Sequence, residues 1–132
     1  MAIMYIDAAA SIEPKLAAGG VLIKTDDATY EASTFLGIMD NHEAEWATFE
    51  FGIEEANRLK LNSLIVYTDS KLIADSFNKG FVKKGIYKSY FDRIQNLSQS
   101  YSMLLVSHTP RKKNKGADRL AKDRLYKERN SL

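Results

Sequence analysis

The segment Ser63–Thr68 constrains the fold of this chain more than any other. It reads Ser-Leu-Ile-Val-Tyr-Thr and contains no charged residue. A continuous apolar run of this length is typical of a strand that is buried on both faces, as strands of parallel sheets are. Parallel strands are joined by crossover connections, which are usually helices. The segment therefore predicts an α/β fold built around a buried parallel strand.

The rest of the chain supplies the other strands and the helices. Runs of apolar and β-branched residues predict strands, and apolar residues at three- and four-residue spacing predict helices. The predicted strands are Ala2–Asp7, Val21–Lys24, Thr29–Leu36, Ser63–Thr68 and Tyr101–Val106, and the predicted helices are 43–60, Lys71–Phe77, Tyr87–Leu97 and 116–127. This order indicates a single domain over residues 1–132, with a five-stranded mixed sheet flanked by helices. The first three strands are antiparallel and the later strands are parallel.

Composition excludes several classes of protein. The hydrophobic fraction of 45% supports a packed core and argues against wholesale disorder. The sequence contains no apolar run of about 18 residues, so we expect no membrane span, and its first residues lack the basic region of a signal peptide. The absence of cysteine excludes disulfides, thiolate metal sites and a cysteine nucleophile. We therefore expect a cytoplasmic protein.

Charge is distributed unevenly along the chain. The net charge is only +2, but residues 1–70 carry 4 basic and 12 acidic side chains, whereas residues 108–132 carry 9 and 3. Such asymmetry often accompanies contact with nucleic acid or a membrane. The informative acids are those at positions where a solvated surface acid is not expected.

Two such acids lie at the ends of predicted strands. Asp7 and Asp69 each share side-chain parity with the apolar residues before them. Because the carboxyl ends of parallel strands meet at the edge where α/β sheets bind ligands, we expect these two side chains to lie close together. Each also has a purely structural interpretation, in which Asp69 caps the following helix and Asp7 stops its strand.

Two further acids lie in the first turns of predicted helices. On an ideal helix Glu45 points roughly 40° from the centre of the apolar stripe, whereas the other glutamates of that helix point about 100° or more away. That stripe consists of Trp46, Phe49, Ile53, Ala56 and Leu59. A buried carboxylate requires a cation, a metal or a strong hydrogen-bond partner. Asp118 lies at the edge of the apolar face of the last helix. Both acids could instead be solvated residues that the helix dipole favours.

Four carboxylates that converge on one place would repel one another, and a divalent cation would relieve that repulsion. The chain has no Cys and only two His. Oxygen ligands therefore remain, and they favour Mg²⁺ or Mn²⁺ over zinc. Two such ions about 3.5–4 Å apart can clamp the attacking and leaving oxygens of a phosphodiester. The acids, with lysines and arginines around them, thus predict a phosphodiesterase that acts on nucleic acid.

The ordered motifs resemble ribonuclease H of type 1 from Ile3 to about Leu125. They are Tyr5-Ile6-Asp7, Glu43-Ala44-Glu45-Trp46, Tyr67-Thr68-Asp69-Ser70, and His108 followed by Asn114 and Asp118. The resemblance implies a ribonuclease-H-like fold. It also implies an endoribonuclease that hydrolyses the RNA strand of RNA–DNA hybrids and leaves 3′-hydroxyl and 5′-phosphate ends.

The same resemblance implies roles for individual residues. Asp7, Glu45, Asp69 and Asp118 would bind two Mg²⁺ ions (or Mn²⁺), with Asp7 bridging both. His108 would assist proton transfer or product release. Contacts to the hybrid are expected from Ala8, Asn41, His42, Ser70, Asn114, Lys83, Lys84, Lys88, Arg111, Lys112 and Lys113. Among these, Asn41 and His42 occupy the segment that contacts RNA 2′-hydroxyls, the groups that distinguish RNA from DNA.

The chain departs from the family pattern in two places. Ala8 replaces the usual glycine after the first aspartate, where glycine permits close backbone approach. Only 38 residues separate Asp69 from His108, which is too few for the basic helical insertion of longer members. Lysines in segment 79–88 substitute for this insertion in part, so we expect weaker, salt-sensitive binding of the hybrid. We also expect a monomer without an obligate protein partner. The alternatives are a non-catalytic nucleic-acid-binding module of this fold, or another nuclease of the superfamily.

Overall fold

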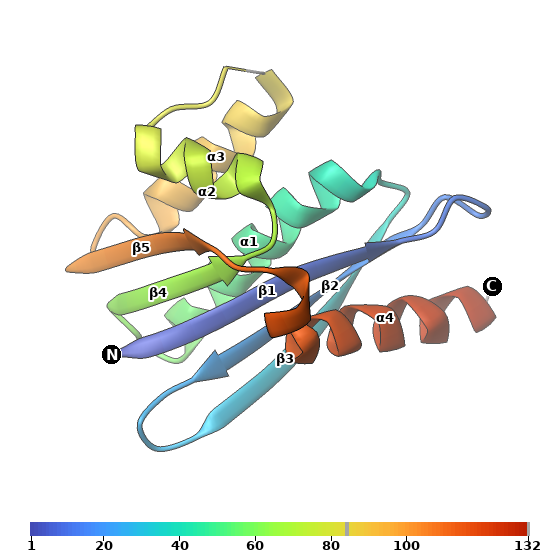
Figure 1. Cartoon of the computed structure of the whole chain (residues 1–132), viewed down its shortest axis with the longest axis horizontal. Coiled ribbons are helices and arrows are strands. Elements are labelled where there is room, and N and C mark those ends of the chain that lie inside the picture. Colours follow the sequence, from blue (N-terminus) through green and yellow to red (C-terminus); the bar gives the residue numbers. More distant parts are fainter. Residues whose placement is uncertain (84, 132) are drawn as a thin grey trace.

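Five strands form one mixed sheet in the computed structural model, which describes residues 1–83 and 85–131. In spatial order they are β3 (Thr29–Gly37), β2 (Ala17–Lys24), β1 (Ala2–Ala10), β4 (Ser63–Thr68) and β5 (Met103–His108). The pairs β3–β2 and β2–β1 are antiparallel, and the pairs β1–β4 and β4–β5 are parallel (Figure 1). The predicted mixed sheet, antiparallel first and parallel later, is confirmed.

Helices lie on both sides of this sheet (Figure 1). They are α1 (Asn41–Arg58), α2 (Lys71–Lys79), α3 (Gly85–Leu97) and α4 (Lys115–Asn130), with a short 3₁₀ turn over Arg111–Lys113 before α4. The first three helices enclose the larger core, and α4 packs on β1, β2 and β3 from the other side. A short connection joins α2 to α3, so the described residues contain no additional helix between them.

The apolar stripe predicted for α1 forms the centre of the larger core. Trp46, Phe49, Ile53 and Ala56 are all fully buried. Phe77 of α2 packs at a tilt against both aromatic rings of this stripe. None of the helices in the described part of the chain is long and apolar enough to cross a membrane. The cytoplasmic location stays a prediction.

The first two strands are longer than predicted. The parallel ladder between β1 and β4 ends at the pair Tyr5–Tyr67, but antiparallel pairing of β1 with β2 continues to Ala10. The prediction that Asp7 ends its strand is therefore wrong. Residues 17–20 are small and favour strands weakly, but the ladder with β1 holds them in β2.

The last strand is displaced from its predicted position. The register of β4 with β5 runs from the pair Ser63–Met103 to the pair Thr68–His108. His108 is therefore the last residue of β5, and not a residue of the loop that follows. The strand was predicted two residues too early because Tyr101 and Ser102 read as strand formers. In the structure the backbone N–H of Tyr101 closes a turn with Ser98, and its hydroxyl donates to Asn57 of α1.

The strand Ser63–Thr68 is covered on only one face. Leu64, Val66 and Thr68 are buried, whereas Ile65 and Tyr67 on the other face are only half-buried. The helix on that side, α4, packs against β1, β2 and β3. The prediction that both faces of this strand are buried is wrong, because the position of α4 leaves its second face without a helix.

We predict that Gly20→Ala destabilises the protein by about 2–3 kcal/mol. A Cβ atom at this position would clash with the carbonyl oxygen of Ala117 and lie 2.6 Å from the backbone nitrogen of Ala121. Both are backbone atoms of α4, so the whole helix must shift. Gly85→Ala is the matched control, because its Cβ meets no atom within 4 Å among the described residues. Equal urea midpoints for the two variants would contradict this prediction.

Candidate metal centre

Three acidic side chains from three different elements converge at one edge of the sheet. Asp7 lies on β1, Glu45 on α1, and Asp69 directly after β4. Each offers a carboxylate oxygen, and these three oxygens all lie within 4.8 Å of one another. Asp7 and Asp69 project from neighbouring parallel strands whose last pair is Tyr5–Tyr67. The register of β1 with β4 thus brings the two aspartates side by side, as their parity predicted.

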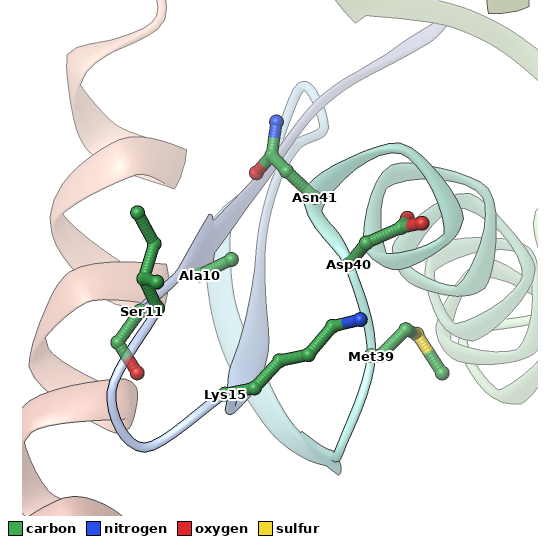
Figure 2. A pocket seen from close by; sticks show the side chains of 7 residues that line it. Ala10, Ser11, Lys15, Met39, Asp40 and Asn41 are labelled. Carbon is green, nitrogen blue, oxygen red and sulfur yellow. The ribbon is translucent and has the colours of Figure 1, made fainter.

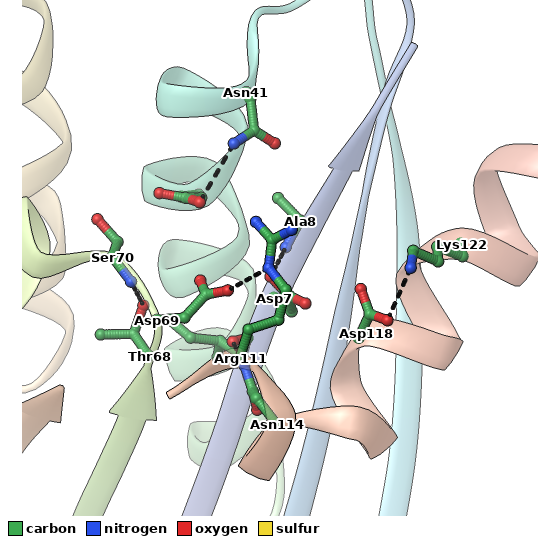
Figure 3. A network of polar contacts seen from close by, with 12 residues as sticks. Asp7, Ala8, Asn41, Thr68, Asp69, Ser70, Arg111, Asn114, Asp118 and Lys122 are labelled. Atoms are coloured by element: carbon green, nitrogen blue, oxygen red, sulfur yellow. Dashed lines mark hydrogen bonds and ion pairs between the residues drawn. The ribbon is translucent and has the colours of Figure 1, made fainter. Parts of the chain in front are cut away.

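Glu45 approaches the two aspartates from the first turns of α1. The residues on either side of it, Ala44 and Trp46, are buried, and Glu45 itself is half-buried. Asp40 caps the helix by accepting from the backbone N–H of Glu43 at 2.8 Å. Asn41 is thereby free to donate from Nδ2 to Oε1 of Glu45 at 3.3 Å (Figure 3). Glu45 therefore points toward the core side of its helix, as the position of the apolar stripe predicted.

The convergence raises the pKa of two of these acids. Burial, the charge of Asp69 and a hydrogen bond with Asp118 raise the pKa of Asp7 to about 8. Burial and the charge of Asp69 also raise the pKa of Glu45, although Ser70, His42 and Asn41 oppose the shift. The metal-free cluster therefore holds more carboxylates than it can ionise at neutral pH. A divalent cation would remove this conflict, and hard carboxylate oxygens are the ligands that Mg²⁺ and Mn²⁺ prefer.

Asp118 lies beside this group, in the first turn of α4. It is outside the set of three oxygens described above, but it lies close enough to Asp7 to help raise the pKa of that carboxyl. Lys122, one turn further along α4, contacts Oδ2 of Asp118 at 3.0 Å. The Lys122 contact follows from the four-residue spacing on a helix. Figure 3 shows Asp118 facing the aspartates of the sheet from the opposite side to α1.

Asn114 braces the end of the 3₁₀ turn against β1. Asn114 is 1% exposed, and its Nδ2 donates to the carbonyl oxygen of Ile6 at 2.7 Å. Its backbone carbonyl oxygen accepts from the backbone N–H of Asp118. The side chain of Asn114 therefore fixes the backbone immediately before Asp7, and its backbone joins the first turn of the helix that carries Asp118. Sequence reasoning predicted Asn114 as a substrate contact and missed this brace, because nothing in the sequence signals a bond across 108 residues.

Arg111 reaches over the cluster from the 3₁₀ turn. Its Nε lies 3.4 Å from Oδ2 of Asp69, and the side chains are 79% and 9% exposed, respectively. The hydrogen bond with Asp69 and the charges of Asp69 and Asp7 raise the pKa of Arg111. The guanidinium therefore neutralises part of the cluster in the metal-free protein.

We predict that Arg111→Gln tightens Mn²⁺ binding about twofold to fivefold, because the guanidinium no longer competes for Asp69. Isothermal titration of the substrate-free protein measures this affinity. Lys112→Gln is the matched control, since it removes the same charge from the neighbouring residue. An equal change in affinity for both variants would show that only the net positive charge of the 3₁₀ turn matters, and not the contact of Arg111 with Asp69.

Ser70 holds the backbone next to Asp69 at the start of α2. Its hydroxyl accepts from the N–H of Ile73 at 3.3 Å, and its own N–H donates to the hydroxyl of Thr68. Ser70 therefore caps α2, and the alternative interpretation of Asp69 as that cap is wrong. Ala8 donates its N–H to Oδ1 of Asp7 at 2.9 Å, which helps to orient that carboxylate.

A hollow of about 410 Å³ opens beside the first turn of α1 (Figure 2). Its lining comes from the end of β1, the loop that follows, and the start of α1, and consists of Ala10, Ser11, Ile12, Lys15, Met39, Asp40 and Asn41. Asn41 thus lies between this hollow and Glu45. His42, also predicted to contact RNA, is exposed on the same turn.

The remaining predicted contacts lie on two other parts of the surface. Lys83 and Lys88 are exposed near the start of α3, where Lys88 pairs with Asp92 at 2.7 Å. Lys84 lies outside the described residues. Lys112 and Lys113 are exposed on the 3₁₀ turn. His108 is exposed at the end of β5, beside Thr68 in register.

Comparison with known proteins identifies the family. Residues 6–124 match the model of the reverse transcriptase-like family. The chain belongs to this family. A relative from Enterococcus faecalis, named "Putative hydrolase EbsB", is 31% identical over 126 residues, which cover 94% of this chain and 93% of the relative.

Solved structures place this reverse transcriptase-like chain in the ribonuclease-H-like fold. RNase H1 from Halobacterium salinarum matches with a TM-score of 0.87 and 22% identity, over 96% of this chain and 98% of that one. LC11-RNase H1, solved in complex with an RNA/DNA hybrid, matches with a TM-score of 0.84 and 28% identity, over 93% and 95%. The resemblance to ribonuclease H of type 1, in a short form without the helical insertion, is confirmed at the level of family and fold.

Proposed function

We propose that this protein is an endoribonuclease that hydrolyses the RNA strand of RNA–DNA hybrids and leaves 3′-hydroxyl and 5′-phosphate ends. The observation that carries the proposal is the convergence of Asp7, Glu45 and Asp69 at one edge of the sheet, with Asp118 beside them. A cluster whose acids cannot all ionise without a cation is suited to metal-assisted phosphodiester hydrolysis.

The resemblance to ribonuclease H of type 1 implies that the four acids would hold two cations. Glu45 and Asp69 would hold one Mg²⁺ ion, Asp118 would hold the other, and Asp7 would contact both. Two bound cations supply a clamp that stabilises charge on the attacking and leaving oxygens of the phosphodiester. The chain's own part is to keep the carboxylates in place through the Asn41–Glu45 bond and the Asn114 brace.

Residues around the cluster would bind and orient the hybrid. Asn41 and His42 lie at the start of α1, on the side where 2′-hydroxyl contacts are expected. Arg111 would hold a backbone phosphate once a metal replaces it at Asp69. His108 would move a proton or help release the product. The similar LC11-RNase H1 has been solved with an RNA/DNA hybrid, which supports this class of substrate.

Ala8 and the short connection between α2 and α3 favour a second candidate, a binding module with little or no catalysis. Such a module has no need for all four acids, and this chain retains them. The nuclease is therefore the better supported of the two.

A panel of labelled duplexes tests the proposal. The protein is incubated with Mg²⁺ or Mn²⁺ and an RNA–DNA hybrid, an RNA duplex, a DNA duplex or single-stranded RNA, with either RNA end labelled. We expect internal cuts in the RNA of the hybrid alone, with 5′-phosphate products, at a rate that falls steeply with salt. Hybrid binding without any product would favour the binding module, and shortening from one end only would favour an exonuclease.

A further inference from the structure

Six apolar side chains lie on a face of the sheet that belongs to neither hydrophobic core of the described residues. We call this surface the open face, and it consists of Ile3, Tyr5, Leu22, Ile65, Tyr67 and Leu105. Leu105 is 51% exposed, and the other five are half-buried. The open face includes the side of β4 that was predicted to be buried but is only half-buried in the structure.

The strand register arranges these side chains in two rows across four strands. In the first row, Leu22 of β2, Tyr5 of β1 and Tyr67 of β4 are consecutive partners. The rings of Tyr5 and Tyr67 stack with a centroid distance of 5.3 Å. In the second row, Ile3 pairs with Ile65, and Ile65 pairs in turn with Leu105. The open face is therefore continuous from β2 to β5.

Nothing in the described part of the chain covers the outer half of this surface. On this side α4 packs on β1, β2 and β3, whereas α2 packs on β4 and β5 from the opposite face (Figure 1). Parallel strands normally have both faces covered. Contiguous exposed apolar patches on a soluble domain mark sites of interaction. The bare face of β4 and β5 is therefore a surface that a partner would cover.

Lysines border the open face on one side. Lys24 lies 5.7 Å from the ring centre of Tyr5. Lys112, Lys113 and Lys115 line a hollow of about 260 Å³ together with Tyr5 and Leu22. Within residues 1–83 and 85–131, none of these four lysines forms an ion pair with an acidic side chain. Their charges remain available to an acidic partner.

We propose that the open face docks an acidic amphipathic helix from a partner protein. The apolar side of that helix would cover the two rows, and its acids would meet the lysines of the 3₁₀ turn and β2. Three strand spacings of about 4.8 Å make the surface about 14 Å wide. This width accommodates about ten helical residues at 1.5 Å each. Such a helix would lie beside α4 and complete the cover of the sheet.

Two other occupants fit the surface less well. A second copy in symmetric contact would place the same lysine-bordered face against itself, without complementary charge. Single-stranded nucleic acid binds through exposed ring faces. In the open face the two tyrosine rings stack on each other, and the other four side chains are aliphatic. The mixture of aliphatic rows and a basic border favours an acidic helix.

The probe is a fluorescent amphipathic peptide of about 14 residues, with leucines along one helical side and glutamates elsewhere. Binding to the metal-free protein is measured by anisotropy, and the contact residues by amide chemical shifts in NMR. We expect micromolar binding and shifts concentrated on β1, β4 and β5. Leu105→Glu should weaken binding about tenfold or more. Tyr126→Glu, which changes a 67% exposed residue of α4 outside the open face, should not.

The controls separate this proposal from the others. A peptide with lysines in place of the glutamates should bind at least about tenfold more weakly. The proposal fails if the acidic peptide does not bind at about 1 mM, or if Leu105→Glu binds it equally. It also fails if an oligothymidylate shifts the same amides, or if sedimentation reveals a dimer that Leu105→Glu disrupts. Leu105→Glu should cleave hybrids normally, so the docking and nuclease proposals can fail independently.

Discussion

Asp7→Asn is expected to slow hybrid cleavage by about 10³-fold or more while making the metal-free protein more stable at pH 8. The loss of activity follows because Asp7 is the carboxylate shared by both proposed cation positions, and tenfold in rate corresponds to only about 1.4 kcal/mol. The gain in stability follows because Asn keeps the shape of the side chain without its charge.

The sign of the stability change comes from the pKa of Asp7. Its value in the folded protein, about 8, is higher than its ordinary value of 3.8. Between these values the folded state binds more protons than the unfolded state, so stability falls as pH rises from about 4 to about 8. Below about pH 4, Asp7 is protonated in both the folded and the unfolded state, and the protein keeps the full stability of the neutral side chain. Asp7→Asn should remove this dependence and add about 2 kcal/mol or more at pH 8.

Thermal unfolding in EDTA at pH 5 and pH 8 measures this effect. We expect Asp7→Asn to melt about 5 °C or more above the parent at pH 8 and close to it at lower pH. Asp123→Asn is the control, because that side chain is 71% exposed on α4. A parent protein whose melting temperature rises from pH 5 to pH 8, or an Asp7→Asn variant that is less stable at pH 8, would contradict the account of the cluster.

Asn114→Ala should cost both stability and activity. It removes the donor that holds the carbonyl oxygen of Ile6, in a position that is almost fully buried. We expect a loss of about 2–3 kcal/mol in the free energy of unfolding. Because the same side chain fixes the backbone immediately before Asp7, the cleavage rate should fall about 10-fold to 100-fold under conditions where the variant is folded.

Asn57→Ala separates the two effects. Asn57 also donates from its side chain to a backbone carbonyl, that of Leu97, and accepts from the hydroxyl of Tyr101. These contacts join the C-terminal end of α1 to the end of α3 and the turn after it, whereas Glu45 lies near the opposite end of α1. The variant should lose comparable stability but keep its kcat. A similar fall in kcat for both variants would show that Asn114 acts through general stability and does not position the acids.

The sequence allowed much of the fold to be predicted because its local patterns agree with the sheet. The order of strands and helices and the side-chain parity of Asp7 and Asp69 depend on periodicity, which is local. The ends of β1 and β5 were predicted wrongly because a neighbouring strand decides where each ladder stops. The burial of β4 on both faces was also predicted wrongly, since the position of α4 is a property of the assembled fold.

In the candidate site, too, features set by the local sequence could be predicted, and features set by the assembled fold could not. Residues that act through their own position on an element, such as Glu45 beside the apolar stripe, could be predicted from spacing. Contacts between distant segments could not be predicted, and these include Arg111 with Asp69 and Asn114 with Ile6. The roles of the lysines depend equally on the fold, because Lys112 and Lys113 lie beside Tyr5 at the border of the open face.

The proposed activity is cleavage of the RNA strand of hybrids by the carboxylate cluster with bound metal. The most direct measurement is cleavage of an end-labelled hybrid with Mg²⁺ by the parent protein and by Asp69→Asn in parallel, with EDTA as the blank. We expect internal cuts by the parent, none in EDTA, and a rate at least about 10³-fold lower for Asp69→Asn. No cleavage by the folded parent with either Mg²⁺ or Mn²⁺, or equal cleavage by Asp69→Asn, would contradict it.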